Sequence, residues 1–167
     1  MVKFLGVACI FFTSAALGIY FSENIKHKKE RLLTERKMLV QIYELIRWNS
    51  LTLHEIARRL FESGDFNQLD YVSFLSQKCS ELRSFPQAWE GAVKHDSKLS
   101  AEEKKLLLEI GAALGTTDKE GQLSTLEFYI SRLDKMAQEE GERYRIKGKM
   151  YRSLGIASGA MIGILII

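Results

Sequence analysis

The most regular hydrophobic pattern in the chain follows a polar start signal at Thr117–Glu120. Apolar residues then recur at three- and four-residue intervals, at Leu123, Leu126, Ile130, Leu133 and Met136. This spacing is typical of an amphipathic helix, and Thr117 with Glu120 predicts a capping box at its start. A polar stretch and then an uncharged segment, Ser153–Ile167, follow. We therefore expect one helical stretch that begins in water and ends in lipid, with a break near Gly141 or Gly148 left open.

The same periodicity predicts five earlier helices. They are a helix from Leu32 to Arg47, a second from the capping box Thr52–Glu55 to Gly64, a third over Phe66–Leu82, a fourth with Pro86 in its first turn, and a fifth from Ser100 to Gly115. Gly115 has the position of a helix C-terminal cap. Because the connections are short, neighbouring helices should be antiparallel. We expect an all-α fold, an antiparallel bundle of about six helices.

A seven-residue spacing of leucine and isoleucine runs through the first two of these helices, at Leu32, Leu39, Ile46, Leu53 and Leu60. This repeat alone would suit a long coiled coil. Polar residues interrupt it at Glu35, Asn49 and Ser63. We therefore interpret the repeat as bundle packing, with a helix break after Asn49.

The N-terminus carries an uncharged run, Phe4–Phe21, whose 18 residues would form a helix about 27 Å long. This length approaches the roughly 30 Å hydrocarbon core of a bilayer. A cleaved signal peptide with a small-residue site at Ser14–Ala16 is the alternative. We favour an uncleaved anchor because the run is long and basic residues follow at once, at Lys26, Lys28, Lys29 and Arg31.

The charges predict how the chain is oriented. Residues 38–142 carry 12 Lys and Arg against 18 Asp and Glu, although the whole chain has a net charge of +3. The basic clusters Lys26–Arg31 and Arg143–Arg152 flank the apolar ends, as expected of cytoplasmic residues beside membrane helices. Their other reading is binding of anionic membrane lipid. An acidic middle argues against nucleic acid as a partner. We expect an anchor at 1–22, a cytoplasmic bundle at 23–150 and a second anchor at 151–167, so that transmembrane helices flank the bundle.

Small residues recur every four positions in both predicted anchors. They are Ser14 and Gly18 in the first, and Gly155, Gly159 and Gly163 in the second. This spacing lets another helix approach closely, either within the chain or in a partner. Chance is the competing explanation, because membrane helices tolerate glycine.

We find no pattern that indicates catalysis or a cofactor. His27, His54 and His95 lie in three different segments, and none has metal-binding spacing. Gly111 and Gly115 lack the Lys-Ser/Thr that follows the glycines of a phosphate loop. Cys9 falls in the first apolar run and Cys79 on an apolar helix face, so a disulfide is not expected. We expect no catalytic, metal or cofactor site, no small-molecule substrate, and therefore no enzyme.

The order of several short motifs gives a family resemblance that covers essentially the whole chain. These are the N-terminal anchor, Leu51–Glu55 after a turn, Gln87–Glu90, the Leu-Gly…Asp…Gln segment Leu114–Gln122, and the C-terminal anchor. The arrangement resembles the stage III sporulation protein AB family of endospore-forming bacteria. That family is similar to a helical domain of the inner-membrane platform protein of type II secretion and type IV pilus machines.

The resemblance implies a non-catalytic platform component of the channel between mother cell and forespore. It implies a place in the mother-cell membrane, with the bundle in the mother-cell cytoplasm, and a secretion-type ATPase and other channel subunits as partners. Candidate partner-binding residues are Gly115, Asp118, Glu120 and Gln122, whose other reading is a helix cap and a loop hydrogen bond. The alternative function is a membrane-anchored regulator or sensor that binds a small ligand near Trp48, Phe74 and Trp89.

Overall fold

The computed structural model describes residues 2–49, 51–81 and 84–166, with side-chain surroundings for all of these except 2–8, 10, 11, 152, 159, 160 and 162–166. All regular structure in the described ranges is helical, which confirms the all-α prediction. The chain divides into two compact units. Unit 1 comprises residues 1–30 and 135–167, and unit 2 comprises residues 31–134.

The first helix, α1, is a single continuous helix, Val2–Asn49. The chain's one proline lies elsewhere, and the polar segment between the predicted anchor and the predicted helix at Leu32 is rich in good helix formers. Within it Lys26 lies 3.8 Å from both Glu23 and Glu30, at three- and four-residue spacings that support a helix. The sequence pattern marked two apolar segments, and the structure joins them without a break.

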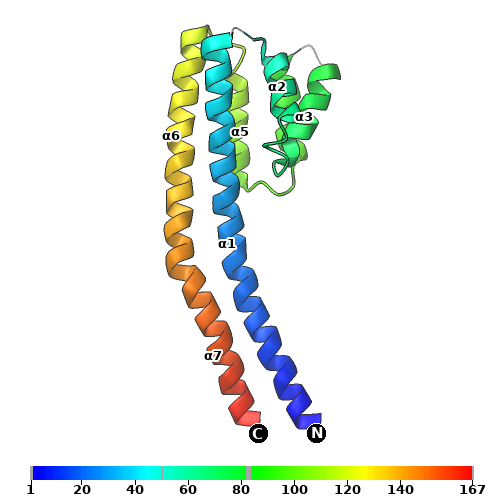
Figure 1. The fold of residues 1–167 in the computed structure, drawn as a ribbon, viewed down its shortest axis with the longest axis vertical. Helices are drawn as coiled ribbons and strands as arrows, with labels where there is room; N and C mark the ends of the chain where they lie inside the picture. Colours follow the sequence, from blue (N-terminus) through cyan, green and yellow to red (C-terminus); the bar gives the residue numbers. More distant parts are fainter. Residues whose placement is uncertain (1, 50, 82–83, 167) are drawn as a thin grey trace. The chain divides into compact units, whose positions relative to one another are not determined.

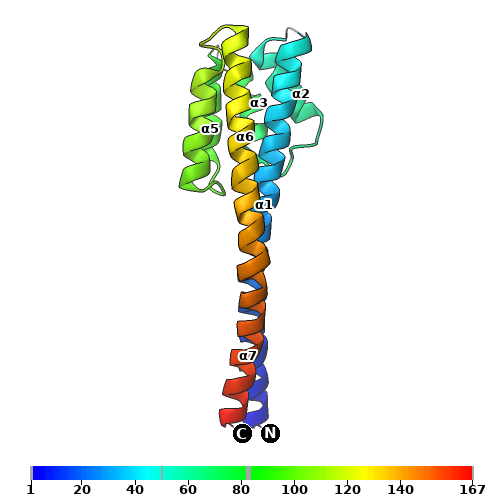
Figure 2. The same ribbon diagram turned by 90° about the vertical axis from the view of Figure 1, so that its left-hand side faces the viewer.

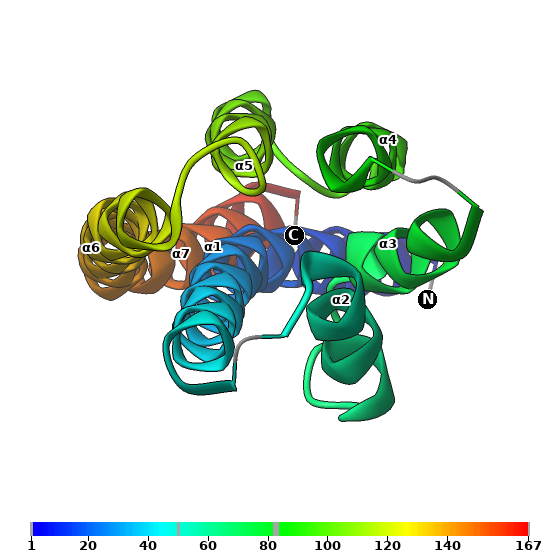
Figure 3. The same cartoon turned by 90° about the horizontal axis from the view of Figure 1, so that it is seen from above.

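Unit 2 is a ring of helices around one apolar core. After α1 come α2 (Leu53–Glu62), α3 (Asp70–Glu81), α4 (Phe85–His95), α5 (Ala101–Ala113) and α6 (Lys119–Arg143). Figure 3 looks down these helices and shows them in chain order around a common interior, with α6 returning beside α1. The core side chains include Leu39, Ile42, Leu60, Leu75, Trp89, Leu107 and Leu126, each at most 1% exposed.

Several predicted helix ends are confirmed. Thr52 and Ser100 each form a complete capping box, with Glu55 and Glu103 respectively. Pro86 lies in the first turn of α4, where its missing N–H costs no helix hydrogen bond. Gly115 follows α5 with a positive φ of 80°, a conformation that a side chain would strain.

Two predicted helix starts are wrong. The third helix begins at Asp70 rather than Phe66, because residues 65–68 form a turn that places both Phe66 and Leu69 in the core. Periodicity alone cannot distinguish apolar residues on a turn from those on a helix. At the start of α6 the capping side chain is Asp118, not Thr117: Asp118 Oδ1 accepts a hydrogen bond from Gly121 N at 3.0 Å. Thr117 Oγ1 instead donates to the Ala113 carbonyl at 3.4 Å.

Unit 1 is a pair of antiparallel helices. The C-terminal part of α6 passes through a π-helical turn, η1 (Tyr144–Gly148), into α7 (Lys149–Ile166). The helical structure therefore continues past Gly141 and Gly148, the two positions where the sequence left a break open, and it is irregular only over the π-helical turn that ends at Gly148. Figures 1 and 2 both show α7 beside the first part of α1, with the N-terminal end of α1 and the C-terminal end of α7 at the same end.

Among the residues that the structure describes, no helix combines the length and the apolar character needed to cross a membrane. Many side chains of the predicted anchors, 1–22 and 151–167, lie outside the described ones.

Candidate functional site

The predicted small residues of the two chain ends meet in unit 1. Gly18 of α1 lies against α7 so closely that a Cβ atom at position 18 would stand 2.5 Å from the Tyr151 carbonyl oxygen. A Cβ atom at Gly155 would stand 2.8 Å from the Ser14 carbonyl oxygen and 3.2 Å from Gly18 Cα. Both glycines are therefore required for this backbone approach, since any side chain would push the helices apart.

Hydroxyl groups add polar contacts to this α1–α7 seam. Ser14 Oγ donates to the Gly155 carbonyl oxygen at 2.8 Å and lies 2.8 Å from Ser158 Oγ. About two helical turns from Ser14 and Gly155, a Cβ atom at Gly148 in η1 would lie 3.1 Å from Ser22 Oγ. The structure thus brings Ser14, Gly18 and Gly155 together within one chain. Gly159 and Gly163 lie on α7, and their surroundings are outside the described side chains.

The predicted partner-binding residues lie at the turn between α5 and α6 in unit 2. Asp118 caps α6, and Gln122 Nε2 donates to the Thr117 carbonyl oxygen at 2.9 Å. Gly115 supplies the positive φ that lets the chain leave α5. These three residues therefore hold the turn itself in shape. Glu120 is exposed in the first turn of α6 and directs its charge toward solvent.

A buried charged cluster in unit 2 was missed by the sequence analysis. Glu35 is 0% exposed, and neither of its carboxylate oxygens has a hydrogen-bond partner among the described residues. Burial raises the pKa of Glu35 to about 8, with the negative charges of Glu103 and Asp96 adding to the rise and Arg31 opposing it. The Tyr71 hydroxyl lies in the same interior, and burial and the Glu35 charge raise its pKa well above the usual range.

Glu103 is held differently in the same cluster. Arg31 donates to it through Nε at 3.1 Å and through Nη2 at 2.7 and 2.8 Å, and the Ser100 backbone N–H donates at 2.8 Å. Burial alone would raise the pKa of Glu103, but the hydrogen bonds from Ser100 and Arg31 together lower it. The pKa of Glu35 is therefore raised and that of Glu103 lowered, so that Glu103 is ionised and Glu35 protonated at neutral pH.

A sequence signal for Glu35 did exist. Glu35 is three residues after Leu32 and four before Leu39, on the apolar stripe that packs into the core. We interpreted it as a polar interruption of the heptad pattern. Its neighbours Asp96 and Glu103 are more than sixty positions away in the chain, so the pattern of one helix does not indicate that acidic groups meet there.

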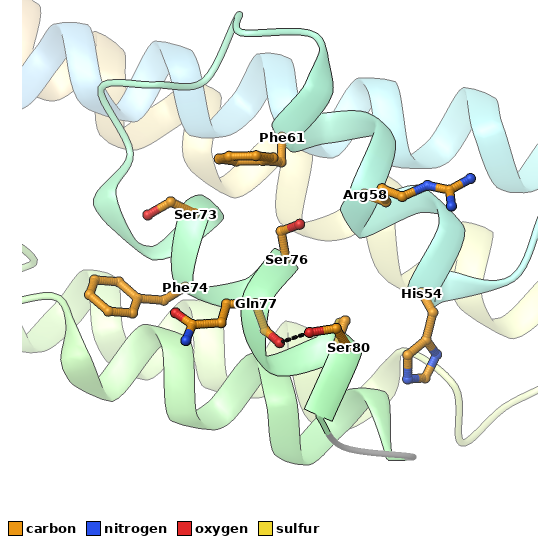
Figure 4. Close-up of a pocket in the computed structure, with 9 residues that line it drawn as sticks. His54, Arg58, Phe61, Ser73, Phe74, Ser76, Gln77 and Ser80 are labelled. Carbon is orange, nitrogen blue, oxygen red and sulfur yellow. Dashed lines mark hydrogen bonds between the residues drawn. The ribbon is translucent and has the colours of Figure 1, made fainter.

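A surface groove lies between α2 and α3, with a volume of about 640 Å³ (Figure 4). Its lining includes His54, Arg58 and Phe61 from α2 and Phe74, Ser76 and Ser80 from α3. Neither tryptophan of the proposed ligand pocket lines this groove.

The two tryptophans occupy different environments. Trp89 is 1% exposed and donates from Nε1 to the Leu107 carbonyl oxygen at 2.6 Å, whereas Trp48 is 69% exposed at the end of α1. Trp48, Phe74 and Trp89 therefore do not surround one ligand cavity.

The metal-ligating and thiol side chains of the described residues can be compared with the geometry that a metal site or a reactive thiol requires. No group of three or more His, Cys, Asp or Glu side chains in these ranges has a geometry that would hold a metal ion. Cys79 is a free thiol on α3, and burial raises its pKa to about 11. Such a thiol stays protonated at neutral pH and is a poor nucleophile.

Comparison with known proteins gives a family. A model of the family described as stage III sporulation protein AB matches residues 3–167, essentially the whole chain. No match was found among the curated proteins or among the solved structures.

Proposed function

Because this chain belongs to the stage III sporulation protein AB family, we propose that its role in sporulation is that of a membrane-anchored, non-catalytic platform. It sits in the mother-cell membrane facing the forespore, with the bundle in the mother-cell cytoplasm. There it couples a cytoplasmic secretion-type ATPase to the other subunits of the channel between the two cells. The apolar ends of α1 and α7 enter the membrane as an antiparallel pair, and the helices of unit 2 carry the docking surfaces.

The observation that carries the anchoring proposal is the exposure of large apolar side chains on the helix pair of unit 1. Phe12, Leu17, Ile19, Leu154, Ile156 and Met161 are each between 52% and 70% exposed. Large exposed apolar side chains that gather on one helix pair mark a membrane or protein contact. The seam at Gly18 and Gly155 supports a membrane contact rather than a protein contact, because helices associate in lipid through tight packing of small residues.

Basic residues follow the apolar surface on both helices of unit 1. Lys28 Nζ lies 2.7 Å from Glu140 Oε1, and Arg143 Nη1 lies 3.2 Å from the same oxygen. The stem of Lys29 lies beside Gly141, 3.4 Å from where a Cβ atom would stand. Lys28 and Arg143 therefore meet at Glu140, where the two basic clusters adjoin along the helix pair, which supports a common cytoplasmic side for both.

A labelling experiment tests the topology. Cys9 and Cys79 are replaced by serine and alanine, and Ser97, exposed between α4 and α5, is changed to cysteine. Whole cells are treated with a membrane-impermeant thiol reagent. Protection in intact cells with labelling after lysis is the expected result. Labelling of intact cells would invert the topology and remove a cytoplasmic ATPase as the partner.

A binding experiment tests the ATPase contact separately. The purified full chain is titrated with the ATPase, and Glu120→Lys is compared with Glu102→Lys. Glu102 is also an exposed acidic residue and lies at the other end of α5, about 17 Å along its axis. We expect Glu120→Lys to weaken binding about ten-fold. Asp118→Asn retains a capping side chain and tests the charge at that position without loss of the cap. Equal binding by both reversals would exclude this turn as the contact.

A further inference from the structure

The groove between α2 and α3 carries different kinds of side chain at its two ends. His54, Arg58 and Phe61 follow one another at four- and three-residue intervals, so they lie on one face of α2. Figure 4 shows Phe61 and Phe74 toward one end of the groove, and Arg58 and His54 toward the other. Seven helical residues separate His54 from Phe61, a distance of about 10 Å along the axis. One end is therefore aromatic and the other basic.

The aromatic end offers apolar surface to a partner. Phe61 is 47% exposed, although it follows directly after the buried Leu60 on the same helix. The centroids of the Phe74 and His95 rings lie 3.8 Å apart, so His95 holds the Phe74 ring in place at the groove wall. Because the His95 ring restrains it, the Phe74 side chain loses little conformational entropy when a partner binds. It is suited to receive one or two apolar anchors.

The basic end is distinguished by its charge. None of the described residues that line the groove is acidic, whereas acidic residues outnumber basic ones, 18 to 12, in residues 38–142. Arg58 forms an ion pair with Glu62 at 3.6 Å, and both side chains are more than 60% exposed. Such surface pairs contribute little, so an incoming carboxylate readily replaces Glu62 as the partner of Arg58.

We propose that this groove docks an amphipathic helix of another protein, with apolar anchors against Phe61 and Phe74 and a carboxylate one to two turns away at the basic end, against Arg58. Helices bind in grooves through anchors at spacings of three, four and seven residues, which matches the distance between the two ends. The groove is open to solvent along its side, whereas small-molecule sites enclose most of their ligand. None of the described residues that line the groove belongs to the turn at Glu120, so the proposal does not depend on the ATPase contact.

The test uses two fluorescent helical peptides with leucines at positions i and i+3 and either glutamate or lysine at positions i+7 and i+10. Anisotropy is measured with the full chain in detergent. We expect the acidic peptide to bind at least ten-fold more tightly than the basic one. Arg58→Glu should reverse this preference, and Phe61→Ser should weaken both peptides. The matched controls are Arg59→Glu and Phe128→Ser, exposed side chains that do not line the groove. They should change affinity less than two-fold.

Four outcomes would overturn the proposal. They are no binding of the acidic peptide at 100 µM, equal binding of the two peptides, equal effects of Arg58→Glu and Arg59→Glu, and competition by phenyl phosphate, which would make the groove a small-ligand site. A concentration-dependent self-association that Arg58→Glu abolishes would instead assign the groove to a second copy of this chain. The topology and ATPase experiments are unaffected by any of these results.

Discussion

The indole ring of Trp89 on α4 lies directly against Gly111 on α5. A Cβ atom at position 111 would stand 2.6 Å from Trp89 Cγ and 2.7 Å from its Nε1 atom. The same Nε1 donates to the Leu107 carbonyl oxygen, one turn earlier on α5. The pair therefore fixes how closely α4 and α5 approach in the core of unit 2.

Gly111→Ala is expected to destabilise the bundle by about 1–3 kcal/mol, because the added methyl group must displace a buried indole ring. Gly91→Ala on α4 is the matched control, since no atom lies within 4 Å of its Cβ position. Alanine there should stabilise by up to about 1 kcal/mol through helix propensity. Urea unfolding followed by Trp89 fluorescence, in a Trp48→Phe background, measures both. An equal response of the two glycines would contradict the packing argument.

Glu35 is expected to make stability depend on pH. Its pKa rises from 4.5 in the unfolded chain to about 8 in the folded one, so the folded state holds the proton more tightly. The free energy of unfolding should therefore be highest below pH 4.5 as far as Glu35 is concerned. It should fall by up to about 1.4 kcal/mol per pH unit between pH 4.5 and 8, and change no further above pH 8.

The measurement is the difference between Glu35→Gln and the natural chain in urea titrations at pH 6 and pH 9. The amide cannot ionise, so the variant should gain stability relative to the natural chain as pH rises. Glu90→Gln, a change at an exposed helix position, controls for the loss of an acidic group. If the Glu35 and Glu90 variants show the same pH difference, Glu35 is ionised in the folded state.

The Arg31–Glu103 ion pair is expected to respond differently to single and double substitution. Glu103 is 0% exposed, so Arg31→Met leaves a buried charge without its cation and should cost about 3–5 kcal/mol. Arg31→Met with Glu103→Gln removes both charges and should cost less than Arg31→Met alone. Lys94→Met in the exposed Lys94–Glu90 pair should cost at most about 1 kcal/mol. Thermal unfolding distinguishes these cases.

Local signals in the sequence predicted most of the fold. Thr52 and Ser100 cap their helices through residues three positions away, so the interaction is contained in the sequence pattern itself. The start of α3 was missed because Phe66 and Leu69 enter the core from a turn, and only tertiary contacts decide between turn and helix there. The cap of α6 was missed by one residue, because Thr117 and Asp118 are both capping types.

The interior chemistry was less predictable than the helices. Glu35 lies on an apolar stripe, but its burial depends on helices that close the ring from residues far along the chain. The groove between α2 and α3 arises from two helices whose exposed residues carry no motif. By contrast, the spacing of Ser14 and Gly18 was visible in the sequence, because close helix approach requires small residues at regular intervals.

The α1–α7 seam predicts a specific disulfide. Ser14 Oγ and Ser158 Oγ lie 2.8 Å apart, so cysteines at both positions should form an intramolecular bond on mild oxidation of membranes. Thr13 is exposed and its hydroxyl donates to the Cys9 carbonyl on its own helix, so Thr13→Cys with Ser158→Cys is the control and should not cross-link. Both pairs are made in a chain without Cys9 and Cys79.

Gly18→Ile should then abolish the Ser14–Ser158 cross-link, because the isoleucine side chain would meet the Tyr151 carbonyl oxygen. Ala16→Ile, at an exposed neighbouring position, should leave it intact. Cross-links between two chains rather than within one would show that the small residues pair separate molecules.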